Sequence, residues 1–227
     1  FEQFFQEYGH EVANHYDLIQ LDPSFRMFFG KDDVLDIPAN FDELCDLFES
    51  LEPNSGDKLR KFMHEAAYKY EVSMEDLIYN PGLSLMEFAN SKVIKGAFKL
   101  QLLSSFSKYV RKYFKHPKLI ALMEFPVLFL GSMPKNTPAL YSLMNYAGLK
   151  LGTWYPKGGF AKIVEGMANV AQEKGVRIHT NAAIEKLQTN KKNITRVSAS
   201  AKEMDVDAVV GAADYHHVEN SLLADGL

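Results

Sequence analysis

Residues 154–180 constrain the fold of this chain more than any other segment. The aromatic pair Trp154-Tyr155 leads through a proline into two adjacent glycines, Gly158 and Gly159, which allow the backbone to turn tightly. The apolar residues of 161–174 recur at three- and four-residue steps, so we predict a helix there that ends at Gly175. The β-branched run at 176–180 predicts a strand. The expected order is therefore strand, glycine turn, helix, strand.

The glycine turn has two interpretations that spacing alone does not separate. A turn of this kind at a helix N-terminus can present N–H groups and the positive end of the helix dipole to an anion. Most turns of this kind only connect two elements. The segment is therefore consistent with a cofactor contact, although local physics alone favours a plain connection.

Charge is distributed unevenly along the chain. Residues 1–90 contain 19 acidic and 6 basic residues, a balance of −13, and the remainder contains 10 acidic and 19 basic residues, a balance of +9. No acidic residue occurs at 91–123. The basic residues there are interleaved with aromatic and aliphatic ones, and they are Lys92, Lys95, Lys99, Lys108, Arg111, Lys112, Lys115 and Lys118.

This basic stretch has two readings that both stay open. It has the composition of helices that lie on an anionic membrane surface. A solvated basic face over a buried apolar stripe gives the same pattern. An acidic overall pI and the lack of a recognised motif argue against nucleic acid as a partner.

The remaining periodicities indicate an α+β fold. We expect a helix at residues 1–15, a three-stranded meander, and then mostly helices between residues 38 and 146, one of them capped by Asn40. After residue 180 we expect strands again, with a hairpin turn at 190–193 and a terminal helix capped by Asp214. The expected strands are at 16–21, 25–29, 34–37, 182–188, 194–200 and 206–211.

Metal and membrane-spanning sites are not predicted. On a continuous helix His10 and His15, five residues apart, would not share one face, and the adjacent His216 and His217 would also point apart. The apolar run at 125–130 is too short to cross a bilayer. The single cysteine, Cys45, excludes a disulfide within the chain.

Four segments carry a resemblance to a known family. They are YDLIQLDPSFRMFF at 16–29, KYEV at 69–72, FLGSMPKNTPALYSL at 129–143, and WYPKGGF at 154–160. Together they resemble the bacterial-type phytoene desaturases, which belong to the flavoprotein amine oxidase superfamily. The likeness covers nearly the whole chain in the same order.

The resemblance implies roles for particular residues. In that family the glycine turn passes beside the flavin, which implies cofactor contacts at Gly158 and Gly159, and further contacts at Ile184, Ala212 and Ala213. Substrate contacts are implied at Tyr141, Trp154, Tyr155 and Lys157. Membrane docking is assigned to Lys108, Arg111, Lys112 and Lys115. No residue is assigned as the catalytic proton acceptor, and no metal is implied.

The resemblance also implies a division of the chain and a function. Residues 1–15 are expected to form a connecting helix, 16–150 a substrate or lid domain, and 151–227 part of an FAD-binding domain. No GxGxxG unit occurs in the sequence, so we interpret the chain as a central fragment that does not hold FAD tightly by itself.

The implied activity is FAD-dependent desaturation of phytoene or a related polyisoprenoid, by an enzyme peripheral to the inner face of the cytoplasmic membrane. Introducing a double bond requires an acceptor for a hydride, which a flavin supplies and side chains do not. The alternatives are a carotenoid or retinoid isomerase or saturase of the same superfamily, and a non-catalytic membrane-docking module that binds lipid. The oligomeric state is not predicted.

Overall fold

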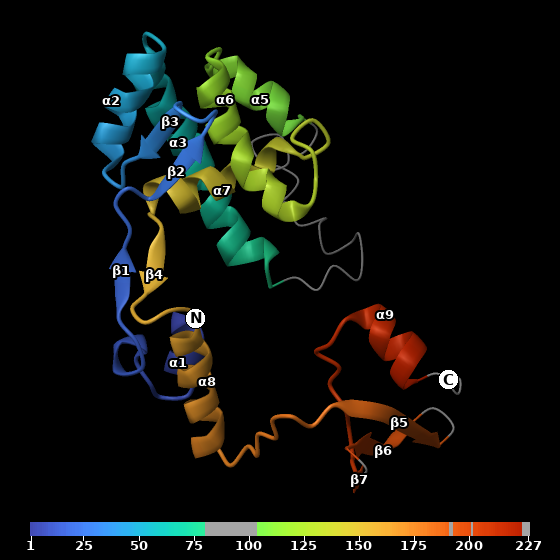
Figure 1. Cartoon of the computed structure of the whole chain (residues 1–227). Coiled ribbons are helices and arrows are strands. Elements are labelled where there is room, and N and C mark those ends of the chain that lie inside the picture. Colours follow the sequence, from blue (N-terminus) through green and yellow to red (C-terminus); the bar gives the residue numbers. More distant parts are fainter. Residues whose placement is uncertain (80–103, 191–192, 201, 224–227) are drawn as a thin grey trace. The chain divides into compact units, whose positions relative to one another are not determined.

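A computed structural model describes residues 1–79, 104–190, 193–200 and 202–223 of the chain (Figure 1). The chain divides into two compact units, Phe1–Glu165 and Gly166–Leu227, which are described separately. Helix α8, Ala161–Glu173, runs across the division. The division falls later than residue 150 because strand β4, Trp154–Pro156, pairs with β1 in the first unit. The functional assignment of the predicted domains stays a prediction.

Helices form the body of unit 1. Helix α3 has α2 on one side and α5 and α6 on the other (Figure 1). The bounds of these four helices are Phe41–Leu51 for α2, Ser55–Val72 for α3, Phe106–Tyr113 for α5 and Pro117–Glu124 for α6. The side chain of Asn40 caps α2 by accepting from the N–H groups of Asp42 and Glu43, which confirms the predicted start of this helix.

The amphipathic pattern of α3 organises the core of unit 1. Its residues at three- and four-residue steps are buried, and they are Leu59, Phe62, Met63, Ala66 and Lys69. Phe62 lies at the centre of an aromatic cluster, with ring centroids 5.0 Å from Tyr109 and 5.4 Å from Tyr113. The core of unit 1 is therefore centred on α3, with buried side chains of α2, α5 and α6 packed around it.

Shorter helical turns connect these helices to the C-terminal part of unit 1. The 3₁₀ turns are η4, Phe125–Leu130, and η5, Ala139–Ser142. The remaining short elements are η2, Ser73–Leu77; α7, Leu143–Asn145; and η6, Tyr146–Lys150. Several prolines in this part of the sequence keep the turns short, because proline has no N–H for a helix interior.

The predicted helix at residues 1–15 is wrong. Helix α1 covers only Glu2–Glu7, Gly9 has a φ of +80°, and a 3₁₀ turn, η1, follows at Val12–Asn14. The chain leaves the helical path at Gly9, and His15 Nε2 lies 3.3 Å from His10 Nδ1. The helical spacing used to separate these two histidines therefore does not apply. Within the described ranges, no group of three or more His, Cys, Asp or Glu side chains is placed to hold a metal ion.

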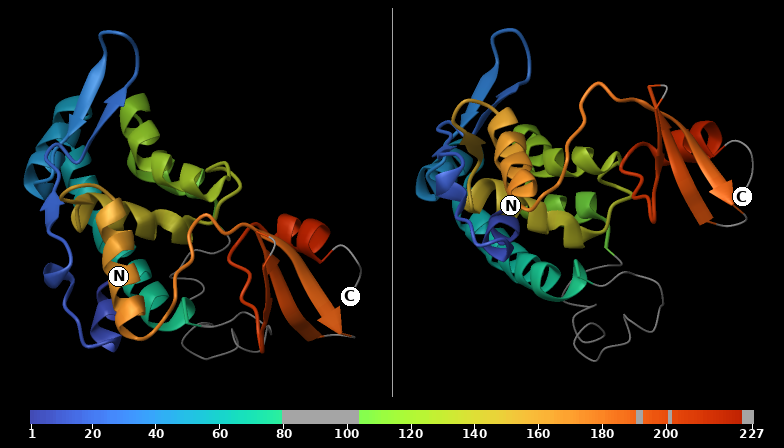
Figure 2. Two further views of the ribbon diagram at one scale, coloured as in Figure 1. Left: turned by 60° about the horizontal axis from the view of Figure 1, so that its bottom comes forward. Right: turned by 90° about the horizontal axis from the view of Figure 1, so that it is seen from below.

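The predicted three-stranded meander is also wrong. Strands β2, Phe25–Phe28, and β3, Val34–Ile37, form a hairpin, which stands out from the helices of unit 1 (Figure 2). Strand β1, Leu18–Gln20, instead pairs antiparallel with β4, with Ile19 opposite Tyr155. Local alternation predicted the strands, but the partner of β1 is distant in sequence, and alternation carries no information on such pairing.

Unit 2 contains a three-stranded antiparallel sheet and a short helical segment. The strands are β5, Ile184–Asn190; β6, Asn193–Ala199; and β7, Lys202–Asp205, in that order across the sheet. The helical segment consists of α9, Tyr215–His217, and η7, Val218–Leu222. Asp214 caps α9 by accepting from the N–H of His217, as predicted. Leu187, Val197 and Leu222 form the small buried core.

Two predicted strands of this region are not strands in the structure. Residues 176–180 and 206–211 have no regular secondary structure. Their apolar residues Val176, Ile178 and Val210 are exposed. Alternation indicates that a segment can form a strand, and a strand also requires a hydrogen-bonding neighbour. The sheet of unit 2 ends instead with β7, whose four residues are all exposed.

The α+β class predicted from the sequence is confirmed. Unit 1 combines helices with two small antiparallel pairs, and unit 2 is mainly an antiparallel sheet. In the part of the chain that the structure describes, no helix is both long enough and apolar enough to cross a bilayer.

Candidate functional site: the glycine turn, the apolar cavity and the buried lysine

The glycine turn between β4 and α8 has the conformation that its sequence indicates. Gly158 and Gly159 have φ values of +90° and +96°, which side chains on L-residues rarely tolerate. The Gly159 N–H donates to the Pro156 carbonyl at 2.9 Å, and the Lys157 N–H donates to the Asp17 carbonyl at 2.8 Å. The turn is thereby fixed to the chain entering β1, and its backbone angles favour glycine at both positions.

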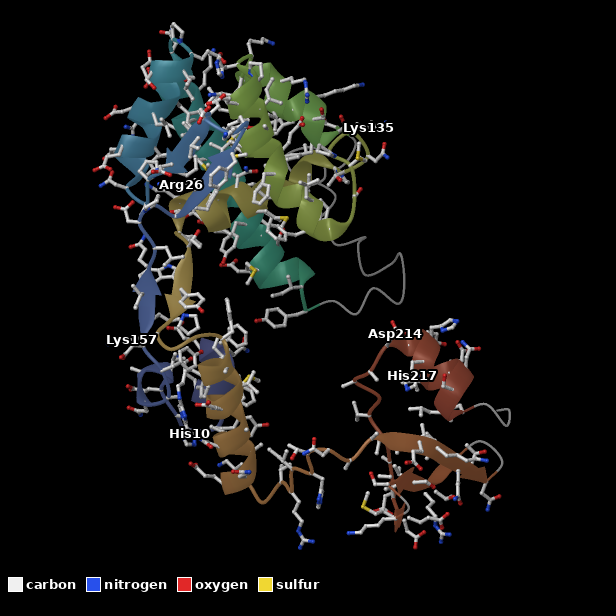
Figure 3. All side chains as sticks on the ribbon, viewed as in Figure 1. His10, Arg26, Lys135, Lys157, Asp214 and His217 are labelled. Atoms are coloured by element: carbon white, nitrogen blue, oxygen red, sulfur yellow. The ribbon has the colours of Figure 1, made fainter. Side chains whose placement is uncertain are left out.

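Aromatic side chains surround this turn and are open to solvent. Trp154, Tyr155 and Phe160 are exposed, and the Tyr155 and Phe160 rings meet edge to face at 5.3 Å. The indole N–H of Trp154 donates to the Leu151 carbonyl at 3.0 Å. Lys157 is exposed next to the glycines (Figure 3). An exposed aromatic face of this kind suits contact with a planar ring or an apolar chain.

Three of the predicted cofactor residues line one cavity in unit 2. Ile184, Ala212 and Ala213 lie on a cavity of about 540 Å³, together with the buried Leu187 and Val197. Residues of the α9–η7 segment complete the lining, among them His217, which Figure 3 labels. The volume is in the range of small-molecule sites, about 300–1,000 Å³.

The chemistry of this cavity fits one part of FAD and not the whole. The walls are mostly aliphatic, and His217 is the only ionisable residue among the lining residues that the structure describes. A flat, uncharged ring fits such walls. A diphosphate needs clustered N–H donors or cations, and the described lining residues include no lysine or arginine. The residues that would hold the ring are Ile184, Ala212 and Ala213.

Tyr141 lies on η5, a half-buried turn that is hydrogen-bonded to a buried lysine. Lys69 is 1% exposed, and its Nζ donates to Ser142 Oγ at 2.9 Å and to the Ala139 carbonyl at 3.3 Å. The same Nζ lies 4.1 Å from the centre of the Tyr109 ring. Lys69 thus joins α3 to both ends of the turn that carries Tyr141.

Glu65 provides the negative charge of this buried network. One carboxylate oxygen accepts from the Tyr109 hydroxyl at 2.6 Å and the other accepts from the Tyr113 hydroxyl at 2.7 Å. Burial lowers the pKa of Lys69 to about 8, and the nearby Glu65 charge partly opposes this. Burial and the hydrogen bond to Glu65 raise the pKa of Tyr113 to about 12.

Sequence reasoning missed this network. The signal that could have found it is a lysine on the apolar stripe of α3, three residues after Ala66 and seven after Phe62. Lys69 is also the first residue of the KYEV segment that carries the family resemblance.

The predicted membrane-docking residues lie on or next to α5. Lys108, Arg111, Lys112 and Lys115 are all exposed, opposite the buried face of the helix. Arg111 is engaged by Glu124, and Lys115 Nζ donates to the Arg111 carbonyl at 2.7 Å. The solvated-face interpretation and the membrane interpretation both fit this arrangement. Of the other residues of the predicted basic stretch, Lys118 pairs with Asp33, and Lys92, Lys95 and Lys99 lie outside the described residues.

Comparison with known proteins identifies the family. Residues 2–227 match the model of the flavin containing amine oxidoreductases. The chain belongs to this family.

Several relatives of this chain are named as desaturases of carotenoids or of phytoene. It is 34% identical over 226 residues to the carotenoid 3,4-desaturase of Haloarcula japonica, with 99% of this chain and 46% of that protein covered. It is 28% identical to the zeta-carotene-forming phytoene desaturase of Myxococcus xanthus, covering 98% and 43%, and 27% identical to the phytoene desaturase of Phycomyces blakesleeanus, covering 98% and 39%. The predicted resemblance is confirmed, and the chain spans less than half the length of these relatives.

Proposed function

We propose that the whole protein introduces a double bond into a carotenoid-type polyisoprenoid, with FAD as the hydride acceptor. The observation that carries this proposal is the family match over residues 2–227, combined with relatives whose names specify desaturation of carotenoids or phytoene. When bound, the flavin supplies the acceptor for a hydride that protein side chains lack.

The residues of this chain would contribute shape and position. A hydrocarbon chain offers no hydrogen-bonding group, so its binding rests on apolar area removed from water, at about 25 cal/mol per Å². The aromatic side chains of Trp154, Tyr155 and Tyr141 suit that task. Gly158 and Gly159 would allow the backbone to approach the cofactor closely, and Ile184 with Ala212 and Ala213 would cover a ring face.

The second hydrogen of each desaturation step leaves as a proton. Removal of two hydrogens from adjacent carbons gives one hydride and one proton, and no residue of the described chain is assigned to accept the proton. The measurable sign of the proposed reaction is therefore reduction of the flavin when a hydrocarbon substrate is added.

The test uses the whole protein loaded with FAD and mixed anaerobically with phytoene in liposomes. Loss of the oxidised flavin absorbance, together with a product that has two hydrogens fewer, is the expected result. An unchanged flavin spectrum with every carotenoid precursor would contradict the proposal. An isomerase would give a product of unchanged mass, and a saturase a product with two more hydrogens.

We also propose that the protein meets its substrate at a membrane surface, through the α5 cations. Lys108 and Lys112 are exposed on the face of α5 opposite its apolar side chains, a geometry that suits anionic headgroups. Replacing Lys108, Arg111, Lys112 and Lys115 by Gln is expected to weaken sedimentation with anionic liposomes. Unchanged sedimentation would favour the solvated-face interpretation.

A further inference from the structure

Four large apolar side chains stand exposed where η4 ends and the chain turns back toward α5. Leu128, Phe129, Leu130 and Met133 are 57%, 75%, 43% and 56% exposed, and we refer to these four residues as the apolar knob. Single exposed apolar residues are common on soluble proteins, whereas a contiguous group of this kind marks an interaction surface.

The apolar knob is held in place from beneath. Of the six residues of η4, only Val127 is buried. Phe125 stacks on Phe25 of the β2–β3 hairpin at 6.0 Å and meets Phe129 edge to face at 5.5 Å. The turn after η4 is tied to the start of α5, since the N–H of Ser107 donates to the Pro134 carbonyl at 3.1 Å. The exposed side chains are thus presented by an ordered support.

The segment around the apolar knob is strongly basic. Residues 104–138 contain one carboxylate, Glu124, and six cations, a balance of +5; the cations are Lys108, Arg111, Lys112, Lys115, Lys118 and Lys135. Two of these cations are paired, Arg111 with that single carboxylate and Lys118 with Asp33 of the β2–β3 hairpin. Lys135 follows the apolar knob on the same loop and is exposed (Figure 3). Exposed apolar side chains next to exposed cations, here Lys108, Lys112 and Lys135, have the chemistry of a segment that enters the headgroup layer of an anionic bilayer.

We propose that the apolar knob inserts into the interfacial layer of an anionic phospholipid membrane, while Lys108, Lys112 and Lys135 contact the headgroups. This inference rests on the membrane docking proposed above. It adds insertion of the apolar knob to the surface contact made by the α5 cations. Electrostatic contact alone would hold the protein reversibly at the surface, and insertion adds apolar burial that salt does not screen.

The β2–β3 hairpin offers a matched control. Phe28 is 70% exposed, close to the value for Phe129, but its turn has no excess of cations, since it carries Lys31 together with Asp32 and Asp33, and Asp33 pairs with Lys118. Exposure is therefore matched at the two positions while the local charge differs. If any exposed phenylalanine were sufficient for membrane binding, Phe28 and Phe129 would contribute equally.

The experiment measures flotation of the whole protein with phosphatidylcholine vesicles and with vesicles that also contain phosphatidylglycerol. The double variant L128S/F129S is expected to bind the anionic vesicles about tenfold more weakly than wild type, from the loss of roughly one apolar side chain's transfer energy. The variant F28S is expected to bind like wild type. In the F129W protein, brominated lipid should quench fluorescence beyond the wild-type level, and in F28W it should not.

Binding of L128S/F129S equal to wild type, or an F129W residue that brominated lipid does not quench, would overturn the inference. So would a loss of self-association in sedimentation without a change in vesicle binding, because the apolar knob would then contact a second copy. Flavin reduction by detergent-dispersed phytoene is measured on the same variant. If L128S/F129S still reduces its flavin and binds vesicles like wild type, membrane insertion is rejected and the proposed activity stands. If the wild-type protein does not reduce its flavin, the proposed activity is rejected.

Discussion

Lys69 occupies a position that the helix pattern assigns to an apolar residue. Its ammonium group is buried against Tyr109 and is hydrogen-bonded to η5, so desolvation is only partly offset. The consequence is a pH-dependent contribution to stability. In the folded protein Lys69 releases its proton near pH 8, and in the unfolded chain it does so near 10.5. Between these values the unfolded state binds more protons, so stability rises with pH.

We therefore predict that Lys69→Met removes this pH dependence. Relative to the variant, the free energy of unfolding of the wild type should rise by about 2–3 kcal/mol between pH 8 and pH 10. Urea unfolding at a series of pH values measures it. The same replacement at Lys61, an exposed lysine of α3, is the control and should leave the wild-type slope intact. A difference between wild type and Lys69→Met that does not vary with pH would contradict the assignment.

Glu52 links the end of α2 to the start of α6. Its carboxylate accepts from Lys58 Nζ at 2.8 Å and from the N–H groups of Lys115 and His116 at 2.7 and 2.8 Å. Burial alone would raise its pKa, but these hydrogen bonds outweigh burial and lower the pKa from 4.5 to about 2. The stabilisation is present above pH 4.5 and is lost as the pH falls toward 2.

Replacing Glu52 by Gln should lower the free energy of unfolding at pH 7 by about 1–3 kcal/mol, because the amide keeps the shape and loses the charge. The variant should also lose less stability than wild type between pH 4.5 and pH 2. Thermal unfolding followed by circular dichroism across this range tests both points. The control is Glu165→Gln in an exposed pair with Lys162, where a change within about 0.5 kcal/mol is expected.

At the scale of elements, the glycine turn before α8 requires its two positive φ angles. Added Cβ atoms would meet no atom closer than 3.4 Å at Gly158 or 3.6 Å at Gly159, so space is available and the backbone angle is the constraint. Gly159→Ala should therefore reduce stability by about 1–2 kcal/mol. Gly148→Ala is the control, since no φ in the left-handed range and no neighbouring atom oppose it. Equal effects of the two substitutions on the denaturation midpoint would contradict the argument.

The elements show where sequence reasoning succeeded and where it did not. Asn40 and Asp214 were recognised because a helix cap is a local interaction between a side chain and N–H groups two or three residues away. The pairing of β1 with β4 was missed because no local pattern encodes a distant partner. The prediction of one helix over 1–15 was wrong because the apolar spacing continues past Gly9, where the backbone leaves the helical conformation.

The candidate site was predictable to a similar degree. The glycines at 158 and 159 were evident from sequence, and the family resemblance directed attention to Ile184, Ala212 and Ala213, which the structure places on one cavity. Their cofactor roles remain predictions. The Lys69 network could not be predicted, because the burial of a lysine depends on contacts from α5 and η5, distant in the chain.

At the scale of the whole chain, the two units have cores of very different size. Unit 1 buries a large cluster centred on α3, whereas the core cluster described for unit 2 consists of Leu187, Val197 and Leu222 with a few partly buried neighbours. Local stability follows the apolar area buried around each amide. The two units are therefore expected to differ in how often they open.

We predict that amides of β5 and β6 exchange with solvent faster than those of α3 in the 227-residue chain. Hydrogen exchange followed by mass spectrometry measures this directly, and Leu187→Ala should accelerate exchange in β5 and β6 without affecting α3. Protection of the unit 2 sheet equal to that of α3 would show that the small core does not limit its stability.

The pairing of β1 with β4 also determines how the intervening chain can evolve. Gln20 lies directly opposite Trp154, so the segment between them leaves and returns at a single point. A segment closed in this way can be lengthened, trimmed or replaced by a homologous one without moving the residues outside it. Chimaeras joined at Gln20 and Trp154 would exchange the helical body of unit 1 between relatives while leaving the glycine turn of the recipient in place.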